Sequence, residues 1–179
     1  MRQRSLVDRL LTVGRLETGS LKLKPEPLDL QPILQEAQNT IFPQAKTRSI
    51  TIETDIPDLL PLVVGDRNGL EQVFTNLLTN AVKFSQDNSQ VSLWTEIKER
   101  GISVWIKDQG VGIPAADIPH LFEGFFRAQN VIEKGIPGSG VGLYIVKSII
   151  EELGGKVSVE SELNVGTVFE IWLPIYHSA

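Results

Sequence analysis

Apolar residues recur at three- and four-residue intervals in four stretches of the chain, which is typical of amphipathic helices. The clearest stretch covers residues 71–86, EQVFTNLLTNAVKFSQ, where the apolar side consists of Val73, Leu77, Leu78, Ala81 and Val82. The same spacing predicts helices over residues 1–17 and 32–45, and a further helix carrying Val141, Ile145, Ile149 and Leu153. A shorter helix is expected near residues 115–122.

Alternating apolar and polar positions predict the strands, and most of them pair as hairpins. Residues 91–97 and 102–107 form one hairpin pattern, and residues 156–160 and 167–173 form a second, turned at 164–166. Shorter strands are expected at 49–54 and 63–65. Helices fall between the hairpins, so we predict an α+β fold: a two-layer sandwich with helices on one face of a mixed, mostly antiparallel sheet.

A proline-containing segment divides the chain into two parts. KLKPEPLDL, residues 22–30, cannot be helical at Pro25 and Pro27, so it reads as an extended linker. We therefore expect a helical part at residues 1–19, a linker at 20–30 and one domain at 31–179. The stripe of Leu6, Leu10 and Val13 in the first part needs a partner helix to cover it.

Composition excludes several classes of protein. The 179 residues are 41% hydrophobic and 22% charged, which argues against disorder, and the net charge of −5 argues against a nucleic-acid partner. There is no cysteine, and the two histidines are far apart, so neither a disulfide nor a zinc site is expected. No apolar run is long enough to cross a bilayer and no signal peptide is visible, so we expect a cytoplasmic location.

The helix over residues 71–86 has a second, polar face. Asn76, Asn80 and Lys83 are four and three residues apart and so share one side of the helix. Two amides and an ammonium group beside a buried face suit a metal-bound polyphosphate. The alternative is an ordinary solvated surface helix.

Two groups of glycines lie near chemically useful positions. Asp108, Gly110 and Gly112 end a predicted strand, where a carboxylate can accept a hydrogen bond from adenine N6 and repel the carbonyl oxygen of guanine. The alternative is a simple turn. Gly138, Gly140 and Gly142 precede a helix whose N-terminal amides could bind phosphate. Neither a Walker A loop nor a GxGxxG motif fits this segment.

Between these groups, residues 121–128 read LFEGFFRA, followed by the loop-like QNVIEKGIPGSG. Phe122 is typical of a residue in a core helix. The whole segment, however, resembles a lid whose aromatic residues pack against the domain while Arg127 binds a phosphate.

Taken in order, these motifs resemble the catalytic, ATP-binding domain of bacterial two-component sensor histidine kinases. NLLTNAVKFS resembles the N box, DQGVGIP the first glycine box, LFEGFFRA the F box and GSGVGLYIVK the second glycine box. The resemblance covers roughly residues 30–175, and the stretch before it resembles the end of the second dimerisation helix and its linker. It implies the Bergerat fold of the gyrase, heat-shock and mismatch-repair ATPases.

The resemblance also implies residue roles, with ATP and Mg²⁺ as cofactors. Asn80 would bind Mg²⁺, Asn76 and Lys83 would act catalytically on the phosphates, and Asp108 would bind adenine. Phe84 stands where the family often has Tyr, so a hydroxyl contact is lost. The remaining residues expected to bind the cofactor are Gly110, Gly112, Ile113, Phe122, Arg127, Gly138, Ser139, Gly140, Val141, Gly142, Leu143 and Thr167.

Asn76 separates kinases from the hydrolytic relatives, which have Glu at the matching position to activate water. An amide cannot accept that proton, so the resemblance implies transfer of the γ-phosphoryl group to a histidine. His120 and His177 lack the sequence context of the family's phosphoacceptor. We therefore expect a piece of a longer kinase that does not autophosphorylate by itself.

The expected partners are the protein's own dimerisation and phosphoacceptor domain and a cognate response regulator. We expect the full-length protein to be a homodimer, and the state of this chain stays open between monomer and dimer. Two other functions stay open as well: a docking module that reports nucleotide occupancy, and a serine kinase of the anti-sigma-factor type.

Overall fold

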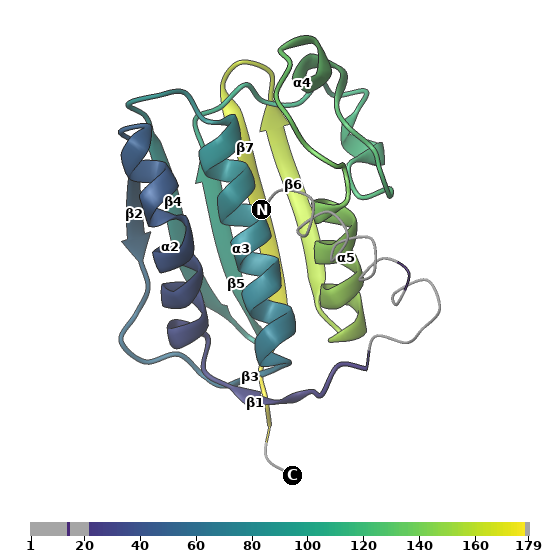
Figure 1. The fold of residues 1–179 in the computed structure, drawn as a ribbon. Helices are drawn as coiled ribbons and strands as arrows, with labels where there is room; N and C mark the ends of the chain where they lie inside the picture. Colours follow the sequence, from purple (N-terminus) through teal and green to yellow (C-terminus); the bar gives the residue numbers. More distant parts are fainter. Residues whose placement is uncertain (1–13, 15–21, 178–179) are drawn as a thin grey trace.

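A computed structural model describes Gly14 and residues 22–177. Apart from Gly14, the predicted helix over residues 1–17, with its stripe of Leu6, Leu10 and Val13, lies outside the described residues. The centre of the fold is a five-stranded sheet (Figure 1). In spatial order its strands are β2 (Thr51–Asp55), β4 (Gln90–Lys98), β5 (Gly101–Asp108), β7 (Gly166–Pro174) and β6 (Lys156–Glu162). Only the pair β2 and β4 is parallel, so the prediction of a mixed, mostly antiparallel sheet is confirmed.

Three helices lie side by side over one face of this sheet (Figure 1). They are α2 (Leu30–Thr47), α3 (Arg67–Phe84) and α5 (Gly142–Glu152). Their apolar stripes meet the inward-facing residues of the strands in one continuous core, as the two-layer prediction required. Within residues 22–177, no helix is both long and apolar enough to cross a membrane.

Aspartate caps fix where α2 and α3 begin. Asp29 accepts a hydrogen bond from the amide of Gln31, and Asp66 accepts one from the amide of Gly69. The second cap places the start of α3 at Arg67, four residues before the predicted Glu71. At the other end, α3 stops at Phe84, and the five predicted core residues of this helix are all buried.

The segment expected as a linker carries a strand. β1 (Glu26–Leu28) pairs with β3 (Val63–Gly65) in a separate two-stranded antiparallel sheet. Leu23 and Leu28 pack against the core, and the amide of Lys24 donates to Asp66, the cap of α3. The prolines exclude helix here as predicted, but the extended chain that they favour is held against the domain.

The segment between β5 and α5 contains little regular structure. The helix predicted near 115–122 is wrong, because only a 3-10 turn, η1 (Ile118–His120), forms there. Pro119 would lie in the interior of the predicted helix, where proline removes a backbone donor and clashes with the preceding turn, and Gly124 disfavours extension beyond η1. A short helix, α4 (Gln129–Glu133), follows and was not predicted.

Candidate functional site

A cavity of about 360 Å³ lies between α3, the end of β5, the start of α5 and the segment between β5 and α5. It brings together residues that are far apart in the sequence. Those predicted as site residues that line it are Asn76, Asn80, Lys83, Phe84, Asp108, Gly112, Ile113, Arg127, Gly138, Ser139, Gly140, Gly142, Leu143 and Thr167. This volume lies within the range of small-molecule sites.

One wall of the cavity is the polar face of α3. Asn76, Asn80 and Lys83 are half-buried and point away from the core, as their spacing predicts. The Lys83 ammonium lies 4.5 Å from the centre of the Phe84 ring. A Cβ atom at Gly138 would lie 2.9 Å from Lys83 Nζ, so glycine allows that loop to approach the ammonium. An amide, an ammonium and a glycine backbone therefore face the same space.

The lining of the cavity also includes a buried carboxyl group. Asp108 is 5% exposed, and its Oδ1 accepts hydrogen bonds from the amides of Gly110 (2.9 Å) and Thr167 (3.3 Å). Burial raises the pKa of Asp108 to about 7, although the two amide hydrogen bonds act in the opposite direction. Both amides bind Oδ1, which leaves Oδ2 for a hydrogen-bond donor in the cavity.

Two predicted site glycines next to Asp108 have different roles. Gly112 lines the cavity and has a φ of +61°, and a Cβ there would lie 2.0 Å from the Glu162 carbonyl oxygen. Gly110 does not line the cavity. A Cβ at Gly110 would lie 2.5 Å from the Phe84 carbonyl oxygen, so this glycine lets β5 approach the end of α3.

The second glycine group leads into the N-terminus of α5. Gly142 begins the helix, and the Asn76 amide oxygen lies 3.7 Å from where its Cβ would be. No side chain caps this helix start. Gly140 has a φ of +72°, and its Cβ position lies 2.6 Å from the Phe126 carbonyl oxygen. Val141, a further residue predicted to bind the cofactor, is fully buried in the core and does not line the cavity.

The lid-like segment covers the cavity with apolar residues. Phe122 does not line the cavity but meets the Phe169 ring edge-on, with centroids 6.5 Å apart, at the margin of the core. Arg127 lines the cavity, and its guanidinium donates to the Ile136 carbonyl within the same segment. His120 lies outside the cavity, with Nδ1 2.7 Å from Glu123 Oε1, and both side chains are exposed.

Sequence reasoning missed several residues that line the cavity: Thr79, Val111, Leu121, Phe126, Ala128, Val131, Pro137 and Phe169. Two of them had a detectable signal. Thr79 is three residues after Asn76 on the same helix face, and Phe169 is two residues after Thr167 on the same face of β7. The others belong to the irregular segment, whose sequence has no period from which a face could be read.

The oxygen atoms that line the cavity suit a Mg²⁺ ion bound together with a polyphosphate. Within residues 22–177, no three His, Cys, Asp or Glu side chains gather as metal ligands. Asn80 provides a hard amide oxygen on the cavity wall. Mg²⁺ commonly takes one or two protein oxygens and completes its shell with phosphates and water, so Asn80 fits that ion when a polyphosphate shares the cavity.

Comparisons with known proteins identify the family of this chain. The family described as histidine kinase-, DNA gyrase B-, and HSP90-like ATPase matches residues 65–177. The alginate biosynthesis sensor protein KinB of Pseudomonas aeruginosa is 32% identical over 170 residues, which cover 95% of this chain and 28% of KinB. The adaptive-response sensory kinase SasA of Prochlorococcus marinus (strain AS9601) is 34% identical over 172 residues, which cover 93% of this chain and 46% of SasA.

Solved structures show the same relationship. Full-length ShkA in complex with AMPPNP has a TM-score of 0.84 and 28% identity over 98% of this chain and 36% of ShkA. The mycobacterial sensor histidine kinase MprB has a TM-score of 0.74 and 30% identity over 85% of this chain and 98% of the MprB chain. This chain spans less than half of the curated relatives KinB and SasA. Sequence, cavity and fold together show that the chain belongs to the histidine kinase-, DNA gyrase B- and HSP90-like ATPase family, with sensor histidine kinases as its relatives.

Proposed function

We propose that this chain binds ATP with Mg²⁺ and transfers the γ-phosphoryl group to a histidine on a separate dimerisation domain. The observation that carries the proposal is the single cavity that joins Asp108 to Asn76, Asn80 and Lys83. Asp108 Oδ2 would accept a hydrogen bond from the adenine amine, which guanine cannot supply at that position. Asn76 and Lys83 would bind the phosphates, and Asn80 would bind the metal ion.

The residues of the cavity favour transfer over hydrolysis. Asn76 borders the start of α5, and its amide cannot take a proton from water as a carboxylate could. Neutral imidazole is already a nucleophile near pH 7, so the chain needs to position the phosphates rather than activate the acceptor. Bound Mg²⁺ would neutralise charge on the phosphates. Lys83 adds a fixed positive charge on the same side.

The acceptor histidine would come from outside residues 22–177. His120 is paired with Glu123 outside the cavity, and His177 is exposed after the last strand. We propose a dimerisation and phosphoacceptor domain as the first partner and a response regulator as the next recipient of the phosphoryl group. We also propose that the chain acts in the cytoplasm, where ATP is available.

Calorimetric titration with ATP and GTP, each with and without Mg²⁺, tests the binding step. We expect binding that is selective for ATP and strengthened by Mg²⁺. Binding of both nucleotides with equal affinity would contradict the role of Asp108. The transfer step is then tested by adding a phosphoacceptor domain with its histidine intact or changed to Gln. Acid-labile label on the intact domain supports a histidine kinase, acid-stable label indicates a serine kinase, and ATP binding without transfer indicates a docking module.

A further inference from the structure

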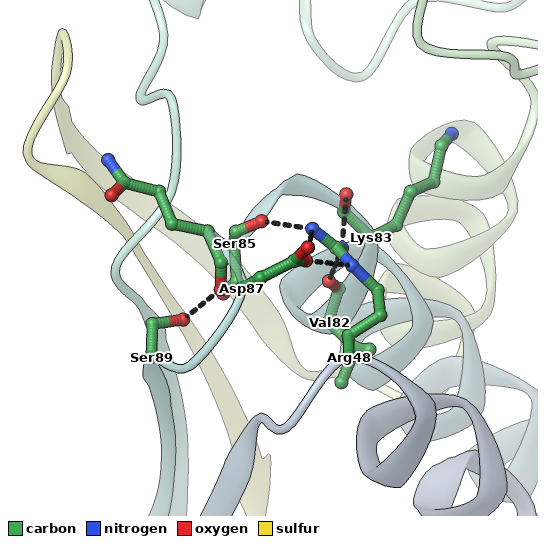
Figure 2. A network of polar contacts seen from close by, with 7 residues as sticks. Arg48, Val82, Lys83, Ser85, Asp87 and Ser89 are labelled. Carbon is green, nitrogen blue, oxygen red and sulfur yellow. Dashed lines mark hydrogen bonds and ion pairs between the residues drawn. The ribbon is translucent and has the colours of Figure 1, made fainter.

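Arg48, directly after α2, donates hydrogen bonds to three backbone carbonyl groups and one carboxylate, yet it does not line the cavity. Its guanidinium reaches across to the C-terminal end of α3 (Figure 2). Nη1 donates to the carbonyl oxygens of Val82 (2.5 Å) and Lys83 (3.0 Å), and Nη2 donates to that of Ser85 (2.8 Å). Nε donates to Asp87 Oδ1 at 2.7 Å.

These contacts replace an ordinary helix C-cap. The last carbonyl groups of a helix have no partner within the helix and carry the negative end of its dipole. Many helices have a glycine in the left-handed region at this point, but the C-cap residue that follows α3 is Ser85, with a φ of −61° and a ψ of 158°. Arg48 supplies both the missing donors and a positive charge. The planar guanidinium can bind three carbonyls at once, which a lysine ammonium cannot do in the same geometry.

The turn that Arg48 holds is the turn that carries the site. Lys83 and Phe84 line the cavity, and the backbone of the next residues contacts the segment after Asp108. The Phe84 carbonyl accepts from the Val111 amide at 3.2 Å, and Ser85 forms an antiparallel bridge with Gly110. The Gln86 amide donates to the Gln109 carbonyl at 3.4 Å. One short backbone segment therefore links the phosphate side of the cavity to its Asp108 side.

We propose that Arg48 is a positioning residue for nucleotide binding. It fixes the last turn of α3, and through that turn it sets the place of Lys83 relative to Asp108. The proposal rests on the proposed function, because it assumes that these two residues bind opposite ends of one nucleotide. Asp87 contributes less, since its side chain is 65% exposed and its ion pair with Arg48 is open to solvent.

The first test compares Arg48→Met with two controls by calorimetric titration with ATP and Mg²⁺, at a temperature where circular dichroism shows each variant folded. We expect about tenfold weaker binding for Arg48→Met, because a loose last turn must be ordered by the nucleotide. Asp87→Asn should stay within about threefold of the wild type. Arg100→Gln, an exposed arginine in the turn between β4 and β5, should be unchanged.

A double-mutant cycle with Lys83→Met separates positioning from general stabilisation. If Arg48 acts through Lys83, the double variant binds ATP about as weakly as Lys83→Met alone. Additive losses, or wild-type affinity in the folded Arg48→Met protein, would overturn the proposal. If the wild type binds no ATP, the proposed function itself fails, so the two failures are distinguishable.

Hydrogen exchange of the protein without nucleotide provides a second measurement. Arg48→Met should speed exchange at the amides of Gln86 and Val111 at least tenfold more than at the amides of β3, which lies at the opposite end of α3. Arg48→Lys takes the place of the methionine variant if that protein does not fold, with a smaller change in the same direction. Uniform acceleration across all strands would mean that Arg48 only stabilises the whole domain, and would contradict positioning.

Discussion

At the scale of single residues, the buried environment of Asp108 destabilises its ionised carboxylate but suits the recognition of a hydrogen-bond donor on a ligand. A carboxyl group with 5% exposure loses most of its hydration, and two backbone amides only partly replace it. The result is a pKa of about 7, so the group is only partly ionised at neutral pH. A donor such as the adenine amine would favour the ionised form, so binding and ionisation should be coupled.

The first prediction follows from that coupling. Only the ionised carboxylate of Asp108 is expected to bind the adenine amine strongly, and with a pKa of about 7 its ionised fraction falls about tenfold between pH 8 and pH 6. ATP affinity should therefore fall by about tenfold over this range. Calorimetric titrations across this range measure the effect, and Asp108→Asn is the control, because it retains the titration of ATP itself. The variant should show a much weaker pH dependence and less discrimination between ATP and GTP. An equal pH dependence in both proteins would exclude Asp108 as the titrating group.

Asn80 carries the second prediction. Its amide oxygen lines the cavity on α3 and is the metal ligand that we propose, so Asn80→Ala should abolish the strengthening of ATP binding by Mg²⁺. ATP affinity without Mg²⁺ should change by less than about threefold. Asn39→Ala, the same substitution on the exposed face of α2, serves as the matched control. Unchanged Mg²⁺ dependence in Asn80→Ala would remove the metal assignment.

At the scale of elements, α3 shows what the sequence could predict. The spacing of apolar residues in α3 predicts that Leu77 lies in the core and that Asn76 and Asn80 lie on the opposite face. In the structure Leu77 is buried, and Asn76 and Asn80 line the cavity. The strand β1 could not be predicted, because its three residues include Pro27 and are too few to show alternation, and their partner β3 is far away in sequence. Phe126 and Val131, in the segment between β5 and α5, line the cavity because of tertiary packing, which no local period encodes.

Gly110 provides the element-scale prediction, at the contact between β5 and the end of α3. A Cβ there would lie 2.5 Å from the Phe84 carbonyl oxygen, and that backbone cannot move without shifting Lys83 and Asp108 apart. Gly110→Ala should therefore lower the free energy of unfolding by ~1–3 kcal/mol and weaken ATP binding. Gly124→Ala is the control, because its Cβ position has no described heavy atom nearer than 4.0 Å. Denaturant unfolding and titration measure both effects, and equal stability of the two variants would contradict the packing argument.

At the scale of the whole molecule, the two faces of the sheet have different tasks. All three long helices lie on one face (Figure 1), and residues of α3 and α5 line the cavity there, while the other face carries a polar network and a stack of Trp94 on Trp105 with ring centroids 5.7 Å apart. At the centre of this network, Glu170 accepts hydrogen bonds from Lys98 (2.8 Å), Ser103 (2.6 Å) and Ser158 (3.0 Å). These contacts cross-link β4, β5, β7 and β6 without touching the cavity.

The last prediction uses that separation. Partial burial would raise the pKa of Glu170, but the hydrogen bonds from Lys98, Ser103 and Ser158 and the charge of Lys98 together outweigh it and lower the pKa. A carboxylate with a lowered pKa stabilises the folded state above its ordinary pKa, and this contribution is lost as the pH falls through the lowered value. Glu170→Gln should therefore lower the free energy of unfolding by ~1 kcal/mol at pH 7 and by progressively less in acid.

The ATP affinity of the Glu170→Gln variant should equal that of the wild type at every pH at which both proteins are folded, since Glu170 faces away from the helices and the cavity. Denaturant unfolding at several pH values and titration with ATP give the two readings. A loss of affinity in Glu170→Gln would mean that the outer face of the sheet communicates with Asp108 through β5 and β7, the strands on which the two carboxyl groups and Thr167 lie. The separation of a stabilising face from a binding face would then be wrong, and the sheet would have to be treated as one coupled unit.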